Sequence, residues 1–168
     1  MYFSSLGVAH PNNYPNISPR PLPLPEMRGR ENSDEWYALN VCDEVLGETS
    51  ARQHSFPFLY GDPGRSGRSR LLCVDAYYPS LRLVIEYCER QHSEAVSFFD
   101  KPTKLTCSGV HRGEQRRIYD ERRRAVLPKH GITLREIHFW QLEHRSGRLL
   151  RNIEADRDTI RGLLVPPT

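Results

Sequence analysis

The segment VDAYYPSLRLVIEY, residues 74–87, places one acid in each of two extended apolar stretches. These stretches predict a β-hairpin with strands over 71–78 and 81–87, joined at Pro79 and Ser80. Burying a carboxylate is costly unless a charge or a hydrogen bond compensates it. The fold must therefore compensate Asp75 and Glu86, and a bound metal ion is one way to do so.

Strand alternation decides whether the two acids meet. With a two-residue loop, Tyr78 faces Leu81, Asp75 faces Val84, and Glu86 lies diagonal to Asp75 on the same face, roughly 7–8 Å away. Two carboxylates at that separation can converge on one divalent cation, whereas a loop with an odd number of residues sends them to opposite faces. The alternative is that Glu86 lies on the solvent side of a half-exposed strand and Asp75 is a polar residue near a turn.

The remaining patterns predict the other elements of the fold. Helices are expected over 33–46, 114–127 and 153–164, and further strands over 53–60 and 132–139. Asn32 and Glu35 have the spacing of a capping box and Gly47 supplies a left-handed stop, while Pro128 and Gly131 end the second helix. This order predicts an α/β fold with a mixed sheet of about four strands flanked by helices.

Residues 1–30 are rich in proline and predict a flexible tail that is either free or lies on the domain, which spans 31–168. The four cysteines are not at zinc-binding spacing and are expected to be reduced thiols. No segment reaches transmembrane length and no leader pattern is present, so we expect a cytoplasmic protein without a membrane partner.

Arginine is concentrated in residues 111–124, although the net charge of the chain is only +3. The planar guanidinium fork matches phosphate, and a helix N-terminus adds backbone N–H groups that bind anions. We expect contacts with nucleic acid from Arg112, Arg116 and Arg117. Alternatively, the interleaved acids Glu114 and Asp120 make this a solvated helix face with spaced ion pairs.

Several residues follow one another in a characteristic order. They are Glu35, Arg52-Gln53-His54, Asp75, Pro79-x-Leu81-x-Leu83-Val84-Ile85-Glu86, His92, and then Asp120, Arg123, Leu127 and Gly131. The run from Glu35 to about Ile137 thereby resembles the PD-(D/E)XK nuclease superfamily. The similarity is to the branch that contains the very-short-patch repair endonucleases and their small bacterial relatives.

The resemblance implies a restriction-endonuclease-like core that cuts DNA, with RNA as the alternative substrate. It implies that Asp75 and Glu86 bind Mg²⁺, or Mn²⁺ in its place, with the carbonyl of Tyr87 as a third ligand. The metal would stabilise charge on the phosphoryl oxygens and lower the pKa of the attacking water. His92 is then a general base or proton shuttle, and Glu35 an accessory acid.

One position departs from the pattern of the superfamily. Two residues after the glutamate stands Cys88 instead of lysine or aspartate, and a thiol neither carries an ammonium charge nor suits Mg²⁺. The residues that can substitute are His92, Glu35, Glu89, Lys101 and Lys104. Glu35 has a second interpretation as a helix cap, and His92 as an ordinary loop residue. Two other functions stay open: a catalytically lapsed module that binds nucleic acid or a partner protein, and a toxin or defence component that acts on RNA.

Overall fold

The computed structural model describes residues 33–64, 66–89 and 105–165. The predicted tail and three predicted site residues, His92, Lys101 and Lys104, lie outside these ranges. The helices are α1 (Asp34–Leu46), α3 (Arg112–Val126) and α4 (Ile153–Leu164), with 3₁₀ turns η2 (Leu127–His130) and η3 (Phe139–Gln141). The strands are β1 (Ala51–Tyr60), β2 (Leu71–Tyr78), β3 (Leu83–Cys88), β4 (Thr133–His138), β5 (His144–Arg145) and β6 (Arg148–Leu149).

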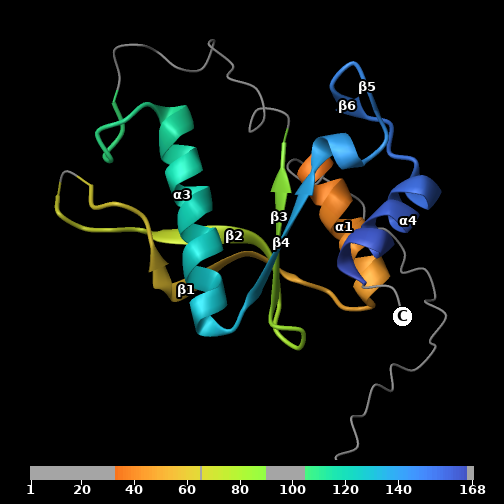
Figure 1. The fold of residues 1–168 in the computed structure, drawn as a ribbon, viewed down its shortest axis with the longest axis horizontal. Coiled ribbons are helices and arrows are strands. Elements are labelled where there is room, and N and C mark those ends of the chain that lie inside the picture. The colour runs from red at the N-terminus through yellow and green to blue at the C-terminus, as the bar shows by residue number, and fades with distance from the viewer. Residues whose placement is uncertain (1–32, 65, 90–104, 166–168) are drawn as a thin grey trace, which may run out of the picture.

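The main sheet has four strands in the order β1-β2-β3-β4. β1, β2 and β3 form an antiparallel meander, and β4 lies parallel to β3 after a crossover through α3. Helices α1 and α4 lie side by side on one face of this sheet and α3 lies on the other (Figure 1). The predicted α/β class and the mixed four-stranded sheet are confirmed.

Two hydrophobic cores fill the two faces of the sheet. Leu83, Ile85 and Tyr87 of β3 belong to the core under α1 and α4, whereas Val84 belongs to the core on the side of α3. Because side chains alternate along a strand, Glu86 follows Val84 onto the α3 side. The strand is thus covered on both faces, and its acid faces a helix.

The start of α1 differs in detail from the prediction. Ser33 is the N-cap, and its hydroxyl oxygen accepts a hydrogen bond from the backbone N–H of Trp36 at 3.1 Å. The expected capping box of Asn32 and Glu35 is therefore wrong, because the helix starts one residue later. Gly47 ends the helix in the left-handed conformation with φ of 67°, as predicted.

The β2–β3 connection is longer than predicted. Tyr78 pairs with Leu83 instead of Leu81, because residues 79–82 form a four-residue turn that ends at Arg82 with φ of 48°. Two and four are both even numbers, so the faces of the strands are unchanged. The pairing runs from Tyr78–Leu83 to Ala76–Ile85, so Val84 lies opposite Tyr77 instead of Asp75, and the two acids are the next residues of their strands.

Other boundaries differ by one or two residues. α3 begins at Arg112 and β4 spans 133–138, and the short β5–β6 hairpin was not predicted. All four cysteines have free thiols, as expected. Within the described ranges, no helix combines the length and the apolar character that crossing a bilayer requires.

Candidate functional site

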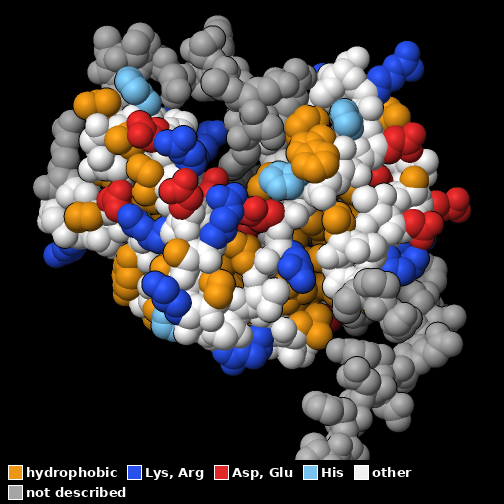
Figure 2. All heavy atoms as spheres, viewed as in Figure 1, with side chains coloured by type: hydrophobic (Ala, Val, Ile, Leu, Met, Phe, Trp, Pro, Cys, Tyr) orange, Lys and Arg blue, Asp and Glu red, His pale blue; other side chains and the backbone are white. Residues whose placement is uncertain are grey.

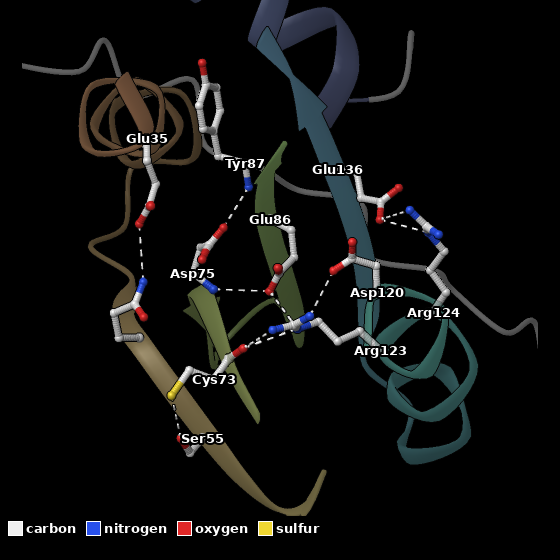
Figure 3. A network of polar contacts seen from close by, with 11 residues as sticks. Glu35, Ser55, Cys73, Asp75, Glu86, Tyr87, Asp120, Arg123, Arg124 and Glu136 are labelled. Atoms are coloured by element: carbon white, nitrogen blue, oxygen red, sulfur yellow. Dashed lines mark hydrogen bonds and ion pairs between the residues drawn. The ribbon is translucent and has the colours of Figure 1, made fainter. Parts of the chain in front are cut away.

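Asp75 and Glu86 meet between β2 and β3 (Figure 3). The backbone N–H of Asp75 donates a hydrogen bond to Glu86 Oε1 at 3.2 Å. In return, the backbone N–H of Tyr87 donates to Asp75 Oδ2 at 2.9 Å. Each carboxylate is thus held by the backbone of the opposite strand, and the predicted sharing of one face is confirmed.

The two acids open into a pocket of about 340 Å³ between the sheet, α1 and α3. Acidic side chains dominate its walls, because six carboxylates and only two guanidinium groups line it. The acids are Glu35, Asp75, Glu86, Glu89, Asp120 and Glu136; the cations are Arg116 and Arg123; and Tyr87, Cys88 and Tyr119 complete the lining. Such an excess of negative charge in a concave site attracts cations.

The Glu86 carboxyl is mostly withdrawn from water, since its side chain keeps 13% of its exposure. Burial, and secondly the neighbouring Asp75 carboxylate, raise the pKa of Glu86 to about 8. The Arg123 guanidinium and the N–H of Asp75 lower this pKa without reversing the shift. The pair is therefore short of positive charge, which a bound cation would provide.

Three consecutive arginines of α3 bind acids in the sheet and in the loop after β1. Arg123 contacts Glu86 Oε1 at 3.5 Å, Arg124 binds Glu136 at 2.8 Å, and Arg122 binds Asp62 at 2.5 Å. Figure 3 shows Arg123 and Arg124 reaching from α3 toward the acids of β3 and β4. These contacts hold α3 against the sheet.

The three arginines predicted to contact nucleic acid do not share one position. Arg116 lines the pocket, whereas Arg112 and Arg117 are exposed on the first turns of α3. Within the described residues Arg116 has no ion-pair partner. On the face seen in Figure 2, arginines and acids gather over α3 and toward β4.

The accessory residues of the prediction divide into two groups. Glu35 and Glu89 both line the pocket, and Glu35 Oε1 accepts a hydrogen bond from Gln53 Nε2 at 3.3 Å. His92, Lys101 and Lys104 lie outside the described residues, so their roles stay predictions. Cys88 also lines the pocket, and burial followed by the charges of Glu136 and Asp120 raises the pKa of its thiol to about 12. The thiol is therefore neutral at physiological pH.

The donor set suits one hard cation bound in part by water. In the described part of the chain, no three His, Cys, Asp or Glu side chains are grouped closely enough to hold a metal ion by themselves. Mg²⁺ commonly takes one or two carboxylates and keeps several waters. Asp75 and Glu86, two carboxylates beside an open acidic pocket, fit that requirement.

Two residues of the site did not stand out in the sequence. Glu136 is the β4 neighbour of Glu86 in the parallel register, and Arg123 reaches Glu86 from α3. The one signal for Arg123 was the spacing Asp120-x-x-Arg123 within the resemblance, and these two residues do form an ion pair at 3.0 Å. For Glu136 the only signal was its place in a predicted strand. Strand alternation does not show that Glu86 of another strand lies beside it.

Comparison of the chain with models of known protein families, with curated proteins and with solved structures finds no match. The functional interpretation therefore depends on the geometry and electrostatics of the pocket.

Proposed function

We propose that the chain is a metal-dependent nuclease of the PD-(D/E)XK superfamily that hydrolyses phosphodiester bonds in DNA. The observation that carries the proposal is the pairing of Asp75 and Glu86 across β2 and β3, at the wall of an acidic pocket. Two acids held together and largely out of water destabilise a fold, and such pairs with a raised pKa are typical of sites whose task requires them. Binding a divalent cation next to a phosphate is such a task.

The order of elements supports the same proposal. A helix, a three-stranded meander, a second helix and a strand parallel to β3 follow one another, as in the sequence run that carries the resemblance. Glu35, Asp75, Glu86 and Arg123, which are far apart in that run, all line one pocket. A chance likeness of short motifs gives no reason for this convergence.

Each residue of the proposed site has an expected role in catalysis. Asp75 and Glu86 would hold Mg²⁺, which supplies a polarised water and charge stabilisation for the phosphoryl oxygens. Arg116, which has no ion-pair partner in the described residues, is positioned to bind the phosphate. Glu35 and Glu89 supply further carboxylates at the pocket wall. His92 is the proposed general base.

The proposal is tested by cleavage assays on the full chain with single-stranded DNA, double-stranded DNA and RNA, in Mg²⁺, Mn²⁺ or chelator. We expect DNA cleavage by the wild type, and a loss of at least about 100-fold in Asp75→Asn and Glu86→Gln, because each removes one carboxylate that holds the cation. Asp158→Asn is the matched control, since that acid lies on α4 with 77% side-chain exposure.

The outcomes separate the candidate functions. Cleavage of RNA but not DNA would assign the chain to the third class, the toxin or defence component. A wild type that cuts neither substrate would contradict the enzyme proposal. Circular dichroism and melting curves of each variant show whether a loss of cleavage reflects a loss of fold.

One observation favours the second candidate, a module that binds nucleic acid without cutting it. Cys88 is buried and neutral where the superfamily places lysine or aspartate. If the wild type shifts DNA on a gel but cleaves nothing in Mn²⁺, the binding module is the better assignment. Cys88→Lys then tests whether restoring the ammonium restores cutting.

A further inference from the structure

Among the residues that the structure describes, Arg123 is the cation that forms an ion pair with Glu86. Its Nε is 3.5 Å from Glu86 Oε1, and Nη1 binds Asp120 Oδ1 at 3.0 Å. Nε and Nη2 also donate to the carbonyl oxygen of Cys73, at 3.2 and 2.8 Å. The side chain is only 16% exposed, so these three acceptors hold the guanidinium against one wall of the pocket (Figure 3).

This placement matters for any cation that binds Glu86. Oε1 of Glu86 already accepts from the Asp75 N–H and faces Arg123. A positive charge at this distance weakens the attraction of Glu86 for a second cation, and does so strongly where water is largely excluded. A guanidinium does not lose its proton in proteins. Its charge can leave the acid pair only if the side chain moves.

We propose that Arg123 is the resident counter-ion of Glu86, and that it competes with the metal ion for this acid. Binding of the metal weakens the Arg123–Glu86 contact. The guanidinium, still held at the pocket wall by Asp120 and the Cys73 carbonyl, then has its charge available for a phosphate. By linkage the effect is reciprocal, so removing Arg123 strengthens metal binding. The inference rests on the metal site of the proposed function. It also means that Arg123 of α3 supplies positive charge to the pocket, which lysine would supply at position 88 and Cys88 does not.

The neighbouring Arg122 offers a matched control. It lies on the same helix, forms one ion pair with Asp62 at 2.5 Å, and donates to one carbonyl, that of Tyr60, at 2.9 Å. Its chemistry therefore parallels that of Arg123. Its partners belong to β1 and the loop after it, and Arg122 and Asp62 are not among the residues that line the acidic pocket.

The test is calorimetric titration of Mn²⁺ into the metal-free full chain at fixed ionic strength. We expect Arg123→Gln to bind Mn²⁺ about tenfold more tightly than the wild type, within the usual range of coupling between two sites. Arg122→Gln should stay within about twofold of the wild type. The double variant Asp75→Asn, Arg123→Gln should lose the site, which shows where the ion binds.

Melting temperature gives a second measurement that does not depend on activity. Without metal, Arg123→Gln should melt below the wild type, because the ion pair with Asp120, the bonds to the Cys73 carbonyl and the charge beside Glu86 are lost. Saturating Mn²⁺ should raise its melting temperature more than it raises that of the wild type. Arg123→Lys keeps the charge and should bind Mn²⁺ like the wild type. Arg123→Met, which keeps an extended side chain without the charge, replaces Arg123→Gln in both measurements if Arg123→Gln does not fold.

The outcomes distinguish this inference from the proposed function. Equal Mn²⁺ affinity of wild type and Arg123→Gln, with binding lost in Asp75→Asn, overturns the counter-ion role and leaves the nuclease proposal intact. Binding detected only in Arg123→Gln supports the counter-ion role. If neither the wild type nor Arg123→Gln binds Mn²⁺, the proposed metal site is wrong, and so is the counter-ion role of Arg123.

Discussion

At the scale of single residues, the acid pair follows from local rules and its surroundings do not. Alternation along two neighbouring strands placed Asp75 and Glu86 on one face even though the predicted loop was two residues too short. Glu136 and Arg123 reach the pocket through the β3–β4 register and the packing of α3. Those depend on long-range contacts, which the pattern of one segment does not contain.

The raised pKa of Glu86 predicts how the metal-free protein responds to pH. A carboxyl whose pKa is higher in the folded chain than in the unfolded chain stabilises the fold at low pH, where it is protonated in both states. That contribution disappears as the pH rises through about 8, the pKa of Glu86 in the folded state. In chelator, Glu86→Gln should therefore be more stable than the wild type at pH 9, by at least about 1 kcal/mol.

The measurement is a series of melting curves in chelator from pH 5 to pH 9. A gain of this size raises the melting temperature by about 2–4 °C. At pH 5 the difference should shrink, because most Glu86 carboxyls are then protonated in the folded wild type. A constant difference across this range would show that Glu86 ionises like an exposed acid.

At the scale of elements, the side chain of Arg82 connects the β2–β3 turn to the segment just before β4. Arg82 Nε donates to the carbonyl of Gly131 at 2.8 Å and Nη2 to that of His130 at 2.6 Å. The backbone carbonyl of Arg82 accepts from the N–H of Thr133 at 2.8 Å. These three bonds hold the turn next to the first pair of the β3–β4 register, Leu83 with Thr133.

Arg82→Ala should destabilise the fold by about 1–3 kcal/mol, since two charge-assisted hydrogen bonds to backbone carbonyls are lost. Chemical unfolding of both proteins measures the difference. Arg68→Ala is the control, because Arg68 is exposed in the loop before β2, and it should change stability by less than about 0.5 kcal/mol. Equal effects of the two substitutions would mean that the turn is held by its backbone alone.

The β5–β6 hairpin shows that alternating hydrophobicity does not predict very short strands. Its strands have two residues each, too few for an alternating pattern. Between them Ser146 and Gly147 have φ of 52° and 75°. Two positive values in succession are typical of a tight hairpin turn. The dipeptide Ser-Gly was the available signal, and it becomes informative only when short strands are expected on both sides.

At the scale of the whole molecule, the sheet separates two different surfaces. α1 and α4 cover one face and α3 covers the other (Figure 1). Arg116 and Arg123 of α3 line the pocket, and Arg112 and Arg117 of the same helix are exposed. The order of elements allowed the class of fold to be predicted, since a helix between two neighbouring strands makes a parallel crossover. We expect DNA to meet the α3 face, because the pocket opens beside that helix.

Arg116→Gln tests this orientation through the salt dependence of DNA binding. A phosphate contact releases counterions from DNA, so losing one should weaken binding and reduce the slope of log K against log salt by about 1. Fluorescence anisotropy in chelator, at several KCl concentrations, measures both without cleavage. The control is Arg161→Gln on α4, whose side chain is 52% exposed and paired with Asp158. If Arg161→Gln lowers the slope and Arg116→Gln does not, DNA binds the opposite face, and the acidic pocket is not where its phosphates lie.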